Sequence, residues 1–239
     1  YCVYSYLETL LRCFCCFLVL LTTPISHAEI SKTVILLSWD GMRHDFPERG
    51  DFPALQRMET DGLRAKRLTP VSLSNTFPGH VSIATGATPD VHGIIDNVFL
   101  YREKGLYADS GGAQWLNAEP LWATAERQGI KAATYFWVGS ETNWPGHPTS
   151  YRMAPFDGSR AELEKVDKII EWLDLPEAER PGLIMSYWRG ADSVSHLKGP
   201  DHEEVAEIIA TQDIQLGRLL TALDERDLWS STTLIVTTD

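Results

Sequence analysis

Residues 34–41 read VILLSWDG, and this stretch decides the fold class of the chain. A short, continuous apolar run that ends at a glycine is typical of a strand buried on both faces of a sheet. The run at residues 183–188 (LIMSYW) has the same character. Residues 131–138 (KAATYFWV) and 232–238 (TTLIVTT) also predict strands, and residues 64–69 predict a shorter one. Helix-forming segments separate these runs. The sequence therefore predicts an α/β fold, with a largely parallel central sheet and helices on both faces.

The helices expected between the strands carry recognisable start and stop signals. Residues 53–61 begin with proline and are followed by a glycine, and residues 159–162 (SRAE) form a capping box that opens a helix. Asp201 and Glu204 are expected to cap the longest helix of the chain. The other expected elements are helices at residues 78–85 and 119–128 and an exposed excursion at residues 100–114.

Composition limits the classes of partner that the protein can bind. The formal net charge is −12 and the isoelectric point is near 5.0, so a surface for polyanions is not expected. We therefore expect a small-molecule substrate and no nucleic-acid polymer. A small phosphorylated substrate is compatible with this charge if a bound metal supplies the positive charge.

The first 28 residues have the features of a secretory signal peptide. Arg12 precedes an apolar run at residues 14–21, and a small-x-small sequence (SHA) follows at residues 26–28. A membrane anchor is the alternative, but the run is shorter than the roughly 20 apolar residues that a span needs. We expect export to the periplasm or the extracellular space, with a signal peptide at residues 1–28, one domain at residues 29–239 and no stable membrane span in the mature chain. The cysteines of the chain all lie in this leader, at positions Cys2, Cys13, Cys15 and Cys16. The mature chain is therefore expected to form no disulfide and no thiolate metal site.

Thr76 is the first candidate for a chemical role. It lies in the stretch 74–97 (SNTFPGHVSIATGATPDVHGIIDN), directly before Phe77 and Pro78 and an apolar helical run. A threonine there caps a helix start, and helix starts bind phosphate groups readily. Taken alone, Thr76 is most simply interpreted as a helix cap. Three distant aspartates favour the chemical role.

These aspartates follow the expected strands. Asp40 ends one strand, Asp239 ends another, and Asp192 lies in the loop after a third. In parallel sheets, ligands bind beyond the carboxyl ends of the strands, so the three carboxylates are expected to gather at one edge. Each could be a turn or cap residue by itself. Together they would repel one another, and bound cations are the economical remedy.

The kind and number of metal ions follow from the donors and their charges. Asp192 and His196 are four residues apart, which brings both to one side of a helical turn, although such a pair is often only a solvated surface pair. A histidine ligand favours zinc over magnesium or calcium. Two divalent cations offset three carboxylates and one phosphodiester, and two metals can activate a hydroxyl such as that of Thr76.

Several motifs in chain order give the sequence a family resemblance. It resembles the nucleotide pyrophosphatase/phosphodiesterase family of the alkaline phosphatase superfamily over nearly all of residues 33–239. The motifs that carry the resemblance are Asp40-Gly41, Asn75-Thr76-Phe77-Pro78, Thr85-Gly86, His92-Gly93-Ile94-Ile95 with Asn97, residues 131–137 (KAATYFW), Gly139-Ser140-Glu141, Asp192 with His196, Gly199-Pro200 and the strand that ends at Asp239. The resemblance implies an alkaline-phosphatase-like fold, with residues 29–239 as a phosphodiesterase catalytic domain.

The resemblance also implies a role for each matching residue. Asp40, Thr76 and Asp239 would hold one zinc ion, and Thr76 would be the nucleophile that is transiently phosphorylated. Asp192 and His196 would hold the second zinc ion, which activates the hydrolytic water.

Three positions would contact the substrate. Asn97 and the backbone N–H of Phe77 would stabilise a non-bridging phosphate oxygen. The side chains of Phe77 and Tyr187 match positions where substrates of the family pack. For Tyr187, a place in the core is the alternative.

The chain also departs from the family pattern. There, one histidine directly follows the aspartate that matches Asp239, and a second comes later; both positions lie beyond residue 239. The chain does contain other histidines, but none of them falls at either position: His44, His80, His92, His147 and His202. Because the chain begins with Tyr1 and stops within a strand-like run, we expect the N-terminal part of a longer catalytic domain. Because it lacks both of the family's histidines, we expect it to bind zinc poorly and to be inactive as it stands. Val138 and residues 188–191 (WRGA) also differ from the family pattern. These differences leave the metal-ligand positions unchanged but weaken the implication of a nucleotide substrate.

Two alternatives remain open from the sequence. One is hydrolysis of phosphomonoesters, phosphonates or sulfate esters, as in other branches of the superfamily. A monoesterase usually needs an arginine or lysine at the phosphate, and Arg43 and Arg189 are the candidates near the motifs. The other alternative is an inactive truncated copy.

Overall fold

A parallel sheet of five strands organises the part of the chain that the structure describes, residues 32–108 and 112–239 of a computed structural model. The strands are β1 (Thr33–Trp39), β4 (Ala132–Tyr135), β5 (Tyr151–Met153), β6 (Leu183–Trp188) and β7 (Thr232–Thr237), in the order β5-β4-β6-β1-β7. All neighbouring pairs in this sheet are parallel. The four long strands expected from the sequence are confirmed. The signal-peptide prediction at residues 1–28 lies outside the described residues.

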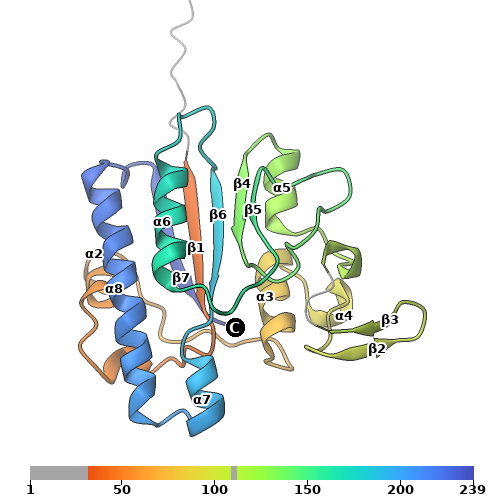
Figure 1. The fold of residues 1–239 in the computed structure, drawn as a ribbon, viewed down its shortest axis with the longest axis horizontal. Helices are drawn as coiled ribbons and strands as arrows, with labels where there is room; N and C mark the ends of the chain where they lie inside the picture. Colours follow the sequence, from red (N-terminus) through yellow and green to blue (C-terminus); the bar gives the residue numbers. More distant parts are fainter. Residues whose placement is uncertain (1–31, 109–111) are drawn as a thin grey trace, which may run out of the picture. The chain divides into compact units, whose positions relative to one another are not determined.

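Helices cover both faces of the sheet, as expected (Figure 1). On one face lie α2 (Pro53–Asp61), α6 (Glu162–Leu173) and α8 (Glu203–Glu225); on the other lie α3 (Thr76–Thr85), α4 (Pro89–His92) and α5 (Leu121–Arg127). Short 3-10 turns lie at Phe46–Glu48 and Ala113–Trp115.

The alternation of side chains along β1 builds two separate cores. Ile35, Leu37 and Trp39 pack with the α2, α6 and α8 face, whereas Leu36 packs with the α3 and α5 face. Successive residues of a strand point to opposite faces, so a central strand must be apolar on both sides. Ser38 is a buried polar residue on the α3 side, where it contacts His80.

Three helix starts differ from the sequence-based prediction. Thr76 is the first residue of α3 and Asn75 precedes it as the cap, so the prediction that Thr76 is the cap is wrong. The helix α6 starts after Ala161, whose N–H donates to the Glu164 carboxylate, rather than at a cap on Ser159. The cap of α8 is His202, whose ring accepts the Glu204 N–H at 3.3 Å, in place of Asp201.

The expected strand at residues 64–69 is wrong. These residues form no strand, and Leu68 is 50% exposed, because the segment has no apolar face to bury against the sheet. The excursion at residues 100–114 holds part of a small antiparallel hairpin instead, made by β2 (Phe99–Tyr101) and β3 (Gly105–Tyr107). Within the described residues, no helix combines the length and apolar character needed to span a membrane.

Candidate functional site

The carboxyl ends of β1, β6 and β7 meet at one edge of the sheet and bring the three aspartates together. Asp40 follows β1, Asp192 opens the short helix α7 (Asp192–Lys198) after β6, and Asp239 follows β7. Because β1 lies between β6 and β7, Asp40 is the middle member of the three. The Asp192 N–H donates to the Asp40 carbonyl at 3.2 Å, and the Gly41 N–H donates to Asp239 Oδ1 at 3.4 Å. In Figure 1 the end of the chain lies at this edge, near α3 and α7.

Two glycines allow this close approach of the chain segments. Gly41 has a φ of +68°, and a Cβ there would lie 2.7 Å from the Asp192 Cα. A Cβ on Gly79 in α3 would lie 2.6 Å from the Asp239 Cβ. Since real Cβ atoms do not pack this tightly, both positions need glycine to keep the aspartates where they are.

The Thr76 hydroxyl faces the middle aspartate. Its Oγ1 donates to Asp40 Oδ2 over 3.5 Å, and the Tyr187 hydroxyl donates to the same oxygen at 2.5 Å. The structure thus brings Thr76 and Asp40 together across 36 residues of sequence, and Tyr187 and Asp40 across 147.

The electrostatics of this edge are those of a cation site. Burial first, and then the neighbouring Asp239 charge, raise the pKa of Asp40 to about 9. Burial also raises the pKa of Asp192. Across residues 32–108 and 112–239, neither lysine nor arginine forms an ion pair with Asp40, Asp192 or Asp239. A divalent cation would supply the missing positive charge, so the donor set fits a metal ion.

Two groups of possible ligands lie side by side. In the first, Asp40, His80 and Asp239 each offer one ligand atom, and these atoms lie within 4.8 Å of one another. In the second, His196 Nε2 lies 3.1 Å from Asp192 Oδ1, and the His196 side chain is 81% exposed. His80 was not predicted from the sequence as a site residue. The spacing of four residues from Thr76 on a helix was the signal that could have found it.

The two groups expected to bind phosphate contact each other. The Phe77 N–H donates to Asn97 Oδ1 at 2.8 Å, which leaves the amide nitrogen of Asn97 as a further donor. The segment before Asn97 is held to the start of α3, because Asn75 Nδ2 donates to Asp96 Oδ1 at 2.7 Å. Both groups thus lie at the start of α3, next to Thr76.

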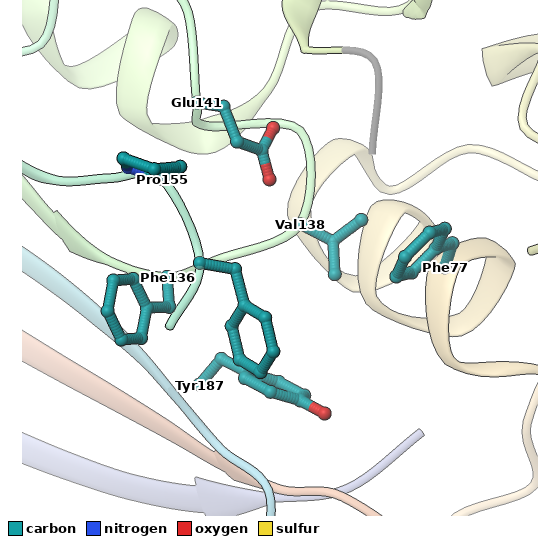
Figure 2. A pocket seen from close by; sticks show the side chains of 7 residues that line it. Phe77, Phe136, Val138, Glu141, Pro155 and Tyr187 are labelled. Atoms are coloured by element: carbon teal, nitrogen blue, oxygen red, sulfur yellow. The ribbon is translucent and has the colours of Figure 1, made fainter. Parts of the chain in front are cut away.

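An aromatic pocket of about 510 Å³ adjoins this edge (Figure 2). Figure 2 shows Phe77 entering it from α3 and Glu141 from the loop after β4. Tyr187 forms part of the wall and is only 7% exposed, so its ring serves the core and the pocket together. The lining residues that the sequence analysis did not assign are Phe136, Val138, Glu141, Pro155 and Phe156. They were missed because their side chains converge only after β4, β5 and β6 pair.

The chain is similar to one family model and to several known proteins. The family model described as type I phosphodiesterase / nucleotide pyrophosphatase matches residues 34–239. An uncharacterised pyrophosphatase/phosphodiesterase of Schizosaccharomyces pombe is 35% identical over 87% of this chain and 44% of its own length. A venom phosphodiesterase of Crotalus durissus collilineatus is 36% identical over 86% of this chain and 26% of its own length. Ectonucleotide pyrophosphatase/phosphodiesterase family member 3 of Rattus norvegicus is 34% identical, over 86% and 24% respectively.

Solved structures agree with the fold. An inactive threonine-to-alanine variant of murine ectonucleotide pyrophosphatase / phosphodiesterase 5, in complex with AMP, has a TM-score of 0.81 and 27% identity. The match covers 87% of this chain and 56% of that one. This chain thus spans well under two thirds of the relatives it matches, and its fold is the one that the sequence resemblance implied. The chain belongs to the type I phosphodiesterase / nucleotide pyrophosphatase family.

Proposed function

We propose that the protein hydrolyses phosphodiester or pyrophosphate bonds of small organic phosphates through a covalent intermediate on Thr76. The observation that carries this proposal is the Thr76 hydroxyl, which faces Asp40 where three strands end and lies beside an aromatic pocket. In the first step Thr76 Oγ would form a bond to phosphorus while the leaving alcohol or phosphate departs. In the second step water would attack phosphorus and break its bond to Thr76 Oγ, which recovers its hydrogen as the phosphate with its remaining organic group is released.

We propose two zinc ions as the cofactors. Asp40, Asp239 and Thr76 would bind one zinc ion. Asp192 and His196 would supply two of the ligands of the other. When bound, the metals would offset the carboxylate charge and lower the pKa values of the threonine hydroxyl and the attacking water. The arrangement of the chain's own groups supports this assignment, since Asp40 and Asp239 lie in one group of possible ligands and Asp192 and His196 form a separate pair. The backbone of Asp192 is joined to that of Asp40 by a hydrogen bond, so the two groups are neighbours.

The chain's own donors would orient the substrate phosphate. The Phe77 N–H and the Asn97 amide lie at the start of α3, where backbone donors favour an anion. Binding there would exchange the bond between Phe77 and Asn97 for bonds to a phosphate oxygen. A diester carries one negative charge and needs few cationic side chains.

The cationic residues near the site favour a diester over a monoester. Arg43 forms ion pairs with Asp45 and Asp201, and the exposed Arg189 donates to the Ser193 hydroxyl. The pocket lining contains no lysine or arginine. A monoester dianion would therefore find little charge compensation from the described side chains.

The pocket supports a nucleotide-like substrate with a flat ring. Aromatic walls bind flat rings well because they offer large apolar faces and favourable stacking geometry. The murine relative with AMP bound supports the same class of ligand.

Export of this protein is supported by the names of its relatives, which include venom phosphodiesterase and ectonucleotide pyrophosphatase. Amino-terminal sequencing of the secreted protein tests this; retention of residues 1–28 would contradict the proposed signal peptide.

Hydrolysis by the full-length, zinc-loaded protein tests the proposed function. We expect release of p-nitrophenol from bis-p-nitrophenyl phosphate, much slower release from the monoester, and loss of both on chelation. The physical reason is that Arg43 and Arg189, the cationic residues near the motifs, have other partners and offer little charge compensation to a dianion. A preference for the monoester, or full activity in the presence of chelator, would contradict the proposal.

Replacing Phe156 with alanine tests the substrate class. We expect KM for a nucleotide substrate to rise by about 10-fold with little change in kcat, because the ring supplies binding area away from the phosphate. The matched control is Phe46→Ala, which removes a buried ring that does not line the pocket. The control is expected to lower the melting temperature and leave KM unchanged. An unchanged KM in Phe156→Ala would argue against stacking in this pocket.

A further inference from the structure

His80 is a buried residue of α3 whose two ring nitrogens both have close partners. Nδ1 lies 2.7 Å from the carbonyl oxygen of Thr76, and Nε2 lies 2.7 Å from the Ser38 hydroxyl. A carbonyl oxygen can only accept, so Nδ1 carries the hydrogen. Nε2 then accepts the Ser38 hydroxyl hydrogen. In the neutral ring, the two contacts together therefore place the hydrogen on Nδ1.

This tautomer distinguishes His80 from the metal ligands beside it. Nδ1 is 3.7 Å from Asp239 Oδ2, which is too long for a hydrogen bond. A histidine binds a metal through the lone pair of an unprotonated ring nitrogen. In His80 one nitrogen donates its hydrogen to Thr76, and the lone pair of the other accepts from Ser38. Although His80 lies among possible ligands, neither nitrogen is available to a metal.

The surroundings hold the ring in this orientation. The Trp137 indole N–H donates to the His80 carbonyl at 3.1 Å. The ring of His80 packs edge-on against Trp137 at 5.6 Å and against Tyr187 at 5.1 Å between centroids. With the side chain fully buried, a rotation of the imidazole would break both hydrogen bonds and disturb this packing.

The Thr76 carbonyl, to which His80 is hydrogen-bonded, belongs to the same peptide unit as the Phe77 N–H, the expected hydrogen-bond donor to the substrate phosphate. The peptide between Thr76 and Phe77 is planar, with its C=O and N–H pointing in opposite directions. His80 binds the C=O on one side, and Asn97 receives the N–H on the other. Fixing the carbonyl therefore fixes the direction of the Phe77 N–H. A hydrogen bond to the carbonyl also polarises the amide and makes its N–H a better donor.

We propose that His80 is a positioning residue, which aims the Phe77 N–H at the substrate phosphate and holds Thr76 beside Asp40, and that it does not bind metal. The chain of contacts runs from Ser38 on β1 through the imidazole to the first peptide of α3. Ser38 is two residues before Asp40, so β1 contains the anchor of this chain of contacts and leads directly into the middle aspartate. The catalytic part of this inference rests on the proposed function; the tautomer does not.

Variants of His80 in the full-length protein test the proposal. In His80→Leu we expect kcat for bis-p-nitrophenyl phosphate to fall by roughly 100-fold, as for a misplaced transition-state contact, with zinc content unchanged. His80→Asn keeps an N–H donor near the position of Nδ1 and is expected to retain most of kcat. A loss of zinc in His80→Leu, or an unchanged kcat, would overturn the proposal.

His92→Leu is the matched control. His92 is also fully buried, and its Nε2 lies 2.9 Å from the Ser82 hydroxyl, farther along α3 from Thr76. This variant is expected to lower the melting temperature as His80→Leu does, while kcat stays near the wild-type value. Equal loss of kcat in both variants would mean that any loosening of α3 is sufficient, and would overturn a specific role for His80.

Nitrogen NMR of the wild-type imidazole separates the tautomer from the reaction. Ring signals typical of a neutral Nδ1–H imidazole, unchanged during a zinc titration, are expected. A shift of either His80 nitrogen on zinc binding would identify it as a ligand and overturn the proposal. If the wild-type protein hydrolyses no diester, the proposed function fails, and this spectrum still decides whether His80 has the assigned tautomer.

Discussion

Thr76→Ala is expected to abolish diester hydrolysis, with kcat reduced by at least about 10⁴-fold, because the variant lacks the oxygen that would attack phosphorus. Within the described residues, the hydroxyl has one long hydrogen bond, to Asp40 at 3.5 Å, so its loss should change stability little. Steady-state kinetics of the zinc-loaded protein measures the effect. Trapping of a phosphorylated protein during turnover should succeed for wild type and fail for the variant.

Two controls make the result specific. Thr76→Ser retains a hydroxyl and is expected to keep measurable turnover. Thr85→Ala removes a hydroxyl from the opposite end of α3, where Oγ1 donates to the Val81 carbonyl at 2.8 Å, and is expected to leave kcat unchanged. A Thr76→Ala protein with wild-type rates would mean that water attacks phosphorus directly and that the covalent mechanism is wrong.

Asp40→Asn is expected to have opposite effects on catalysis and on the stability of the metal-free protein. We expect activity to fall by about 10³-fold or more, because the variant loses the middle carboxylate of the proposed zinc site. In the presence of chelator the same variant should melt at a higher temperature than wild type at pH 8. The reason is that burial and the neighbouring Asp239 charge make an ionised Asp40 unfavourable.

The pH dependence gives this prediction its sign. The folded-state pKa of Asp40 is about 9, well above its ordinary value of 3.8, so the folded protein binds more protons than the unfolded chain between these values. Stability of the metal-free protein should therefore fall as the pH rises from about 4 to about 9, by at most about 1.4 kcal/mol per pH unit for one proton. Thermal melts of the chelated protein measure this slope, which should flatten in Asp40→Asn.

Asp213 supplies the control for a buried carboxylate outside the site. Its side chain is 3% exposed, and its oxygens accept the N–H groups of Ala54 and Leu55 at 3.0 and 2.8 Å. Asp213→Asn should destabilise the protein by about 1–3 kcal/mol, since an amide cannot accept both bonds equally well. Its activity per folded molecule should be unchanged. If Asp40→Asn destabilises the chelated protein in the same way, Asp40 is a structural carboxylate rather than a strained one.

The agreement between sequence and structure is best where a local pattern has one physical cause. Continuous apolar runs predicted β1 and β6 because only a strand buried on both faces is apolar at nearly every position. The helix α2 begins and ends where its proline and glycine predicted. The predictions that Thr76 and Asp201 are helix caps were wrong. Several polar residues near a helix start can act as the cap, and tertiary contacts determine which of them does.

By itself, the sequence determined the α/β class, the acidic residues at strand ends and the family to which the chain belongs. Only the tertiary structure decided which of these residues meet. The strand order puts β1 between β6 and β7, and this alone makes Asp40 the neighbour of Asp192 and Asp239. Likewise, the aromatic pocket and the His80 contact with Ser38 join segments that share no local pattern. The physical reason is that periodicity and caps report on a few neighbouring residues, whereas a site depends on the order in which distant strands pair.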